Sequence, residues 1–177
     1  MVPGFAHWGQ ARGNVKTGGP VADICVRTGE LDRPFMETML GRHHVARIAF
    51  AFHDRIVLSL VNYVYASDWV YARIEAGSGL TTVQHRQWAA LAVDEIDGVY
   101  DWRSVTVHGS VQLLSADDTP AASSEFAKAL ALLRTVVPAV FTADDPMPER
   151  VQIFRLHVNE IVGSESRSTG ADRLPRA

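Results

Sequence analysis

The side chains that could carry out chemistry are few in this chain of 177 residues, and their spacing matches no common catalytic motif. The zinc-protease, P-loop and dinucleotide-binding patterns are missing, and Gly77-Ser78-Gly79 lacks the spacing of a nucleophile elbow. The single cysteine, Cys25, can form neither an internal disulfide nor a four-cysteine zinc site. We therefore predict that any chemistry belongs to a bound cofactor, and we name no catalytic residue.

Two other groups of ionisable residues fit a metal site poorly. His43 and His44 are adjacent in the sequence, and adjacent residues on a helix do not share a face. An acidic cluster near the end of a predicted strand fits either a cation site or a solvated loop, and the loop is favoured; its members are Asp94, Glu95, Asp97 and Asp101. The sequence therefore predicts no metal site.

The composition limits the partners of the chain. Seventeen basic and twenty acidic residues give a net charge of −3, whereas nucleic-acid-binding proteins normally carry a basic patch. No run approaches the ~18 consecutive apolar residues of a membrane helix, and the first residues lack the order of a signal peptide. A lone cysteine is typical of a reducing compartment. We expect a cytoplasmic protein that binds neither nucleic acid nor membrane.

Hydrophobic residues make up 47% of the chain, which is enough for one folded domain. Residues 1–29 hold six of the thirteen glycines, and residues 163–177 contain a single large aliphatic side chain. Neither segment has a hydrophobic period, so we predict a flexible tail at each end. The predicted folded domain is then residues 30–162.

Hydrophobic spacing predicts the elements of this domain. Apolar runs, alternating or continuous, indicate six strands at residues 45–52, 56–65, 69–75, 88–96, 103–114 and 151–162. Helix-start signals predict one helix after Asp32, another after Thr119, and a short helix after Ser78. Six strands with short gaps and no regular alternation with helices predict a mainly β fold, a barrel or a sandwich with a few flanking helices.

Five segments of the domain, taken in order, are similar to those of a known family. The segments are HVARIAF, LVNYVY, WVYARIEAGSGL, LAVDEID and WRSVTVHGSVQLL. They resemble the pyridoxamine 5'-phosphate oxidase-like, flavin-binding split barrels, and more narrowly the nitroimidazole-reductase (Nim-like) group, over residues 30–162. The resemblance implies a six-stranded antiparallel split barrel that forms a homodimer, with flavin mononucleotide (FMN) held at the subunit interface.

The resemblance also implies roles for particular residues. The FMN phosphate would be held by Arg73 and by backbone N–H groups of a turn at a helix start, and that turn consists of Gly77, Ser78, Gly79 and Leu80. Arg47 matches the arginine of the family's first strand. The flavin ring would be lined by the second-strand stretch and by the segment that closes the site, which together supply Asn62, Tyr63, Trp102, Arg103 and Ser104.

Each of these residues also has a plain structural interpretation. Arg47 and Arg103 are equally suited to pairing with surface carboxylates. Tyr63 and Trp102 are equally suited to the core or to an interface, and Ser78 to capping a helix. The chain also departs from the family by having Gly79 where a lysine is usual, and the loss of one such charge weakens phosphate binding by ~10–100-fold.

Three functions follow from these observations. The first is an FMN-dependent oxidoreductase that acts on a small-molecule redox substrate. The second is a non-catalytic or degenerate split-barrel module that binds haem, a deazaflavin or another small molecule, with His43, His44 or His108 as a candidate haem ligand. The third is a small β-barrel that acts only in protein–protein contact, through surfaces built from its four tryptophans.

Overall fold

The computed structural model describes residues 25–52, 54–77, 87–116 and 119–169. Within these residues the chain forms eight strands and two helices. The strands are β1 (Cys25–Glu30), β2 (Val45–Phe52), β3 (Arg55–Ala66), β4 (Trp69–Ile74), β5 (Gln87–Ile96), β6 (Trp102–Leu114), β7 (Gln152–His157) and β8 (Glu160–Thr169). The helices are α1 (Arg33–Arg42) and α2 (Pro120–Val136).

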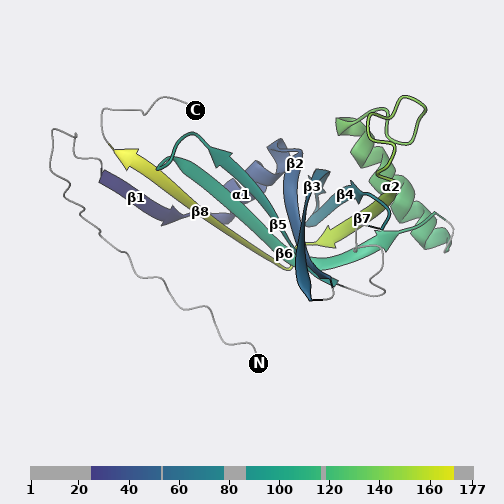
Figure 1. Cartoon of the computed structure of the whole chain (residues 1–177), viewed down its shortest axis with the longest axis horizontal. Helices are drawn as coiled ribbons and strands as arrows, with labels where there is room; N and C mark the ends of the chain where they lie inside the picture. The colour runs from purple at the N-terminus through teal and green to yellow at the C-terminus, as the bar shows by residue number, and fades with distance from the viewer. Residues whose placement is uncertain (1–24, 53, 78–86, 117–118, 170–177) are drawn as a thin grey trace.

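Six of the strands close into an antiparallel barrel in the order β6-β5-β2-β3-β4-β7 (Figure 1). The ring closes because the second half of β6 pairs with β7, from Val111 opposite Leu156 to Leu114 opposite Ile153. Closure pairs strands that would otherwise be exposed edges of the sheet. The mainly β fold and the six-stranded antiparallel split barrel expected from the sequence are thereby confirmed.

The first half of β6 pairs instead with β8, so β7 and β8 follow one another along the same edge of β6. The sequence predicted one continuous strand over residues 151–162, and this was wrong at Val158 and Asn159, which separate the two strands and where the Asn159 amide donates to the carbonyl of His108. Gly109 permits the close approach of the chain at this break, because a Cβ atom at this position would lie 1.7 Å from the carbonyl oxygen of His157. One long β6 therefore serves both the barrel and β8.

β8 continues past the barrel and pairs with β1, and the two strands form a ribbon that projects from it (Figure 1). The predicted domain limits of 30–162 are therefore too narrow, because residues 25–30 and 163–169 were expected to belong to tails. All six residues of β1 are exposed, so the sequence of this strand shows no hydrophobic period from which it could be predicted. The rest of both predicted tails lies outside the described residues.

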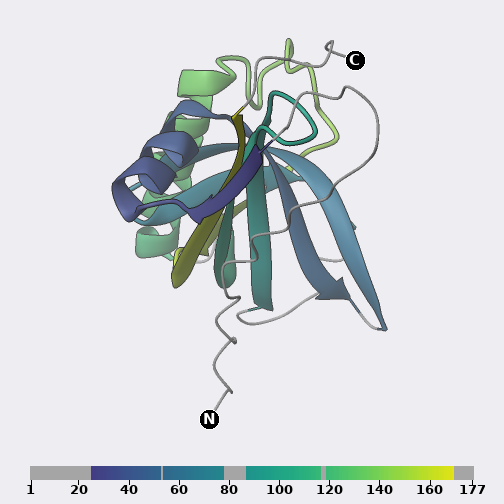
Figure 2. The same ribbon diagram turned by 90° about the vertical axis from the view of Figure 1, so that its left-hand side faces the viewer.

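The two helices begin where their capping signals predict. The Asp32 carboxylate accepts the Phe35 amide at 2.8 Å, and the Thr119 hydroxyl accepts the Ala122 amide at 3.1 Å. Figure 2 shows both helices on one side of the barrel and the β2–β3 hairpin on the other. Neither helix of the described chain is long and apolar enough to cross a membrane. The buried side chains that pack the helices on the barrel are Met36, Met39 and Leu40 in α1 and Ala129 and Leu133 in α2.

Candidate functional site

A line of polar side chains crosses the outer face of the barrel from β4 to β6. Opposed residues of neighbouring antiparallel strands share a face of the sheet, so the observed registers place these side chains side by side. We call this set the polar row, and it consists of Arg73, Asn62, Arg47, Asp94 and Ser104. Four of its five members were predicted as cofactor-binding residues, and the fold brings them onto one face.

Arg73 lies at one end of the polar row and is fully enclosed, with 1% of its surface exposed. Its two terminal nitrogens donate to the two oxygens of Asp145 at 2.5 and 2.8 Å. Asp145 also accepts the amides of Phe141 and Met147, at 2.9 and 3.0 Å, and so fixes the loop between α2 and β7 to the barrel. The hydrogen bonds from Arg73 hold the pKa of Asp145 well below its usual range. The charge of Arg73 is thus neutralised within the chain.

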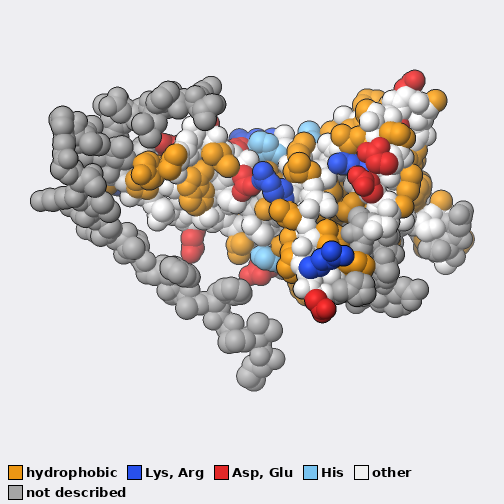
Figure 3. Space-filling model, viewed as in Figure 1, with side chains coloured by type: hydrophobic (Ala, Val, Ile, Leu, Met, Phe, Trp, Pro, Cys, Tyr) orange, Lys and Arg blue, Asp and Glu red, His pale blue; other side chains and the backbone are white. Residues whose placement is uncertain are grey.

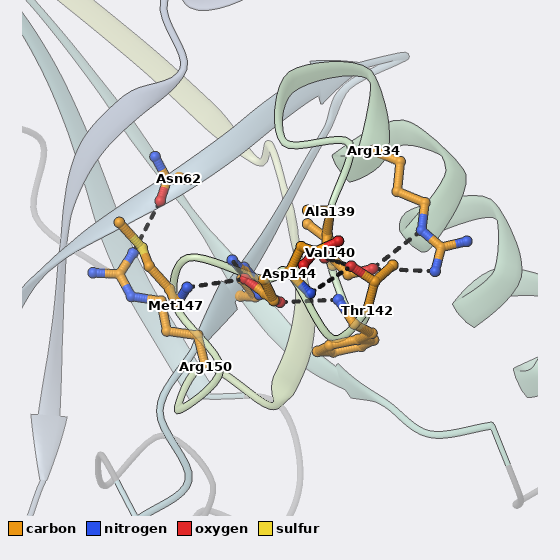
Figure 4. Close-up of polar contacts among 11 residues, drawn as sticks. Asn62, Arg134, Ala139, Val140, Thr142, Asp144, Met147 and Arg150 are labelled. Atoms are coloured by element: carbon orange, nitrogen blue, oxygen red, sulfur yellow. Dashed lines mark hydrogen bonds and ion pairs between the residues drawn. The ribbon is translucent and has the colours of Figure 1, made fainter.

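Asn62 is the next member of the polar row, on β3. Its side-chain oxygen accepts a hydrogen bond at 3.1 Å from Nη1 of Arg150, which comes from the end of the same loop that carries Asp145 (Figure 4). Both side chains are half-buried. Residues 62 and 150 are far apart in the sequence, and this contact joins the loop to β3 at the site.

The other end of the polar row is a chain of three side chains. Nη1 of Arg47 on β2 donates to Asp94 on β5 at 2.9 Å, and the hydroxyl of Ser104 on β6 donates to the other oxygen of Asp94 at 2.7 Å. Trp102 lies two residues before Ser104 on β6 and shares its face of the strand. The pairing of Arg47 with a carboxylate matches its plain structural interpretation, and its guanidinium remains half-exposed.

Tyr63 and Arg103 face the opposite way from the polar row. The Tyr63 side chain is completely buried, its hydroxyl donates to the Leu40 carbonyl at the end of α1 at 2.8 Å, and burial raises its pKa well above the usual value. Arg103 lies against Phe35 of α1 and pairs with Glu95 at 3.3 Å. Neither of these two side chains therefore lies on the outer face. Tyr63 borders that face only through its backbone.

The turn predicted to hold a phosphate begins where β4 ends. Gly77 has a φ of +80°, a conformation that glycine adopts more readily than other residues. Ser78, Gly79 and Leu80, with the short helix predicted after them, lie outside the described residues. Their predicted contacts with phosphate stay predictions.

A second polar cluster joins the end of α1 to β5. Glu95 accepts hydrogen bonds from Arg42 and, at 2.6 Å, from Nε2 of His43. Burial alone would raise the pKa of Glu95, but the bonds from His43 and Arg42 outweigh burial and hold the pKa below its usual range. The acidic cluster predicted from the sequence is thus divided, since Asp94 belongs to the outer face and Asp101 binds Ser168.

An apolar surface borders the polar row on the same outer face of β2, β3 and β5. Five large side chains there are between 56% and 70% exposed, and they are Val45, Ile56, Leu58, Leu60 and Trp88. In Figure 3 exposed hydrophobic side chains, in orange, lie over the lower end of the β2–β3 hairpin. A shallow groove of about 260 Å³ runs through the surface, and its lining includes Ala49, Ala51, Ala90, Trp88 and His108. We call this surface the apolar face.

The sequence analysis missed Asp145 and Arg150, which both contact members of the polar row. They lie in the segment ADDPMPER, whose proline and acidic residues indicate a turn-rich connection. The three arginines and two carboxylates of the polar row region come from β2, β4, β5 and this loop. No spacing in the sequence relates the loop to the strands, and only its tertiary position reveals the site.

Comparisons with known proteins agree with this architecture. Residues 32–165 match the family model described as pyridoxamine 5'-phosphate oxidase. A FAD-binding protein from Mesorhizobium loti has a similar structure, with 22% identity, a TM-score of 0.59, and coverage of 79% of this chain and 97% of that one. A FAD-binding protein from Mycobacterium smegmatis has 17% identity, a TM-score of 0.54, and coverage of 79% and 98%.

A third similar structure is a FAD- and haem-binding protein from Mycobacterium smegmatis. It has 18% identity and a TM-score of 0.57, and the match covers 80% of this chain and 75% of that one. No curated protein matches the chain in sequence. At these identities the similar structures establish the fold, and the family model establishes the relationship by sequence.

Proposed function

The chain belongs to the pyridoxamine 5'-phosphate oxidase family, and from this premise we propose that it is an FMN-dependent oxidoreductase that works as a homodimer. The observation that carries the proposal is the position of the polar row beside the apolar face. Together they provide charged groups for a phosphate and an apolar surface for a planar ring, which is the combination that a flavin nucleotide needs.

The residues present fit a phosphate-bearing cofactor by their charge. Arg73, Arg150 and Arg47 bring three positive charges to the polar row and its neighbouring loop, and Asp145 and Asp94 bring two negative ones. The region therefore has a net charge of +1, which favours an anionic group. The turn that begins at the end of β4 would add backbone N–H groups to this charge.

The residues present also fit a flat aromatic ring. The alanines of the groove, Ala49, Ala51 and Ala90, leave room above the strands, and the Asn62 side chain offers polar atoms farther along the same face of the sheet. Tyr63 would contribute through its backbone, because its side chain is committed to α1. Trp102 and Ser104 lie at the far end of the polar row, where the family resemblance expects the segment that closes the site.

A second copy of the chain is the partner we propose for the apolar face. Large exposed apolar patches are rare on monomeric proteins and usually mark interfaces. Leu58 and Leu60 on β3 and Trp88 on β5, with β2 between these strands, are each more than half exposed. Burying them in a dimer is favourable by about 25 cal/mol per Å² of apolar surface. In such a dimer the groove and the polar row would be shielded from water.

The chain's own residues would bind, orient and shield the cofactor in this proposal. The flavin supplies hydride transfer to or from a small-molecule redox substrate when it is bound. The net positive charge of the polar row region attracts its phosphate, the strand backbone around Asn62 positions the ring edge, and the second copy excludes water. The reducing compartment indicated by a single cysteine supports a cytoplasmic location.

The proposal is tested by the visible absorption of the purified full-length protein, before and after addition of FMN, FAD, a deazaflavin or haem. We expect flavin absorption in the purified protein, or its appearance in the protein fraction after gel filtration with added FMN. A colourless protein that retains no flavin from an excess would contradict the proposal. A Soret band gained only with haem would favour a different cofactor.

A haem- or deazaflavin-binding module without catalysis is the second candidate function. Two observations favour it: Arg73 and Arg47 are each already paired with a carboxylate, and His108 lines the groove of the apolar face. Histidine is a common axial ligand of haem iron. His108→Ala would then abolish the Soret band, whereas the same substitution would leave FMN binding largely intact if the first proposal holds.

A further inference from the structure

We propose that Arg150, at the end of the loop between α2 and β7, is the residue that binds the anionic phosphate group of the ligand. The inference rests on the proposed function, because that proposal identifies the anionic group as the phosphate of a flavin. It replaces Arg73, which the family resemblance favours, as the main cationic anchor.

The three guanidinium groups near the polar row differ in their partners. Arg73 binds both oxygens of Asp145, and Arg47 binds Asp94. Arg150 has a hydrogen bond to the neutral side chain of Asn62 and no carboxylate partner among the described residues. The positive charge that remains in the region therefore belongs to Arg150.

The charge of Arg150 is partly buried. Among the arginines that the structure describes, Arg150 alone is half-buried and has no carboxylate partner. A partly buried charge loses hydration, and an opposite charge normally compensates for the loss. A bound anion would supply that charge, and the guanidinium is well suited to phosphate because it presents several N–H donors in one plane.

Arg150 is already oriented by contacts within the chain. Its backbone amide donates to the Met147 carbonyl at 3.1 Å, the Met147 amide donates to Asp145 at 3.0 Å, and Asp145 is fixed by Arg73. Its side chain is held at Nη1 by Asn62 (Figure 4). The other nitrogens of the guanidinium have no partner among the described residues. A group held in this way loses little conformational freedom when it binds a ligand.

Arg150 lies at the same end of the β4–β7 ladder as the turn expected to contact phosphate. The ladder ends with Ile74 opposite Gln152; Arg150 comes two residues before Gln152, and Gly77, which begins that turn, comes three residues after Ile74. From this place the Arg150 side chain reaches Asn62. The Arg73–Asp145 pair supports that place by holding the loop.

The test compares Arg150→Met with the matched variant Arg134→Met. Arg134 is exposed and donates to the Val140 carbonyl in the same loop, outside the polar row. Both changes remove one guanidinium and keep an unbranched stem, and Arg150→Lys keeps the charge without the planar donors. Circular dichroism confirms that each variant folds. Two readouts follow for the full-length proteins: thermal stabilisation by inorganic phosphate, and affinity for FMN against riboflavin, which has the same ring without the phosphate.

We expect phosphate to raise the melting temperature of the wild type and of Arg134→Met, at matched ionic strength, but not that of Arg150→Met. We also expect the wild type to prefer FMN to riboflavin, and Arg150→Met to lose about 10- to 100-fold of FMN affinity with little change for riboflavin. Arg150→Lys should recover part of the preference.

Two results would overturn the inference: unchanged phosphate stabilisation in Arg150→Met, or a preference for FMN that survives this substitution. A wild type that binds neither flavin contradicts the proposed function instead, and the phosphate readout then decides the role of Arg150 independently. If phosphate stabilises neither the wild type nor the variants, Arg150 is not an anion site.

Discussion

The buried pair of Arg73 and Asp145 offers the sharpest test of how the loop between α2 and β7 is held. Replacing Arg73 with methionine keeps most of the side-chain volume and removes both hydrogen bonds to Asp145, whose side chain is 1% exposed. The carboxylate then keeps only the amides of Phe141 and Met147. Removing one partner of a buried ion pair typically costs about 3–5 kcal/mol, because the other charge is left buried and uncompensated.

That cost translates into a large fall in thermal stability. For a chain of this size each kcal/mol lowers the melting temperature by about 2–4 °C, so Arg73→Met should melt about 6–20 °C below the wild type. Differential scanning calorimetry measures the difference. Arg33→Met is the matched control, because Arg33 pairs with Glu37 in an exposed position and exposed pairs contribute little.

The dependence on pH provides a second check. The pKa of Asp145 is lowered in the folded protein, so the pair contributes fully above the unfolded-state pKa of about 3.9 and its contribution is lost as the pH falls through the folded-state pKa. The gap in melting temperature between the wild type and Arg73→Met should therefore narrow below about pH 4. The double variant Arg73→Met/Asp145→Leu should recover much of the loss. If Arg73→Met melts no lower than Arg33→Met, the pair does not hold the loop.

Three further predictions concern the fold and its surfaces. Gly109→Ala should prevent folding, because the added Cβ would lie 1.7 Å from the His157 carbonyl oxygen. The control Gly41→Ala, whose added Cβ has no atom within 4 Å, should be neutral or stabilising by up to about 1 kcal/mol. Circular dichroism and soluble yield distinguish the two variants. Leu58→Glu places a charge on the apolar face and should convert a dimer to a monomer in sedimentation velocity, and an unchanged dimer would contradict the proposed interface. Glu95→Gln should lower the melting temperature at pH 7, and because the folded-state pKa of Glu95 is lowered, the difference should narrow as the pH falls below the unfolded-state pKa of about 4.3; a constant gap would contradict this assignment.

The elements of the fold were largely predictable because each has a local signal. The cap of Asp32 and the alternating apolar residues of β2 and β6 act over a few positions, and the structure confirms them. The β1–β8 ribbon was missed because it forms through backbone pairing, which has no preference for apolar side chains. The break between β7 and β8 was missed because it depends on the close approach of His157 to Gly109, on different strands.

The candidate site was predictable only in part. The strand pattern predicts on which face of its strand Arg47 lies and on which face Ser104 lies. Their observed partners lie on the same face of the sheet, so this alignment follows once the strands are assigned correctly. The neutralisation of Arg73 was not predictable, because Asp145 lies 72 residues away in a connection that the sequence describes only as turn-rich. Arg150 was missed for the same reason. Tertiary contacts of a loop decide which of these charges is available to a ligand.

Sedimentation velocity of the FMN-loaded protein, recorded at both the protein and the flavin absorption bands, tests most directly whether the flavin is bound by a dimer of the chain. The account predicts a single boundary in both signals at twice the 19.4 kDa mass of one chain. Flavin that stays behind as a free small molecule, or that travels with a single chain, would contradict it.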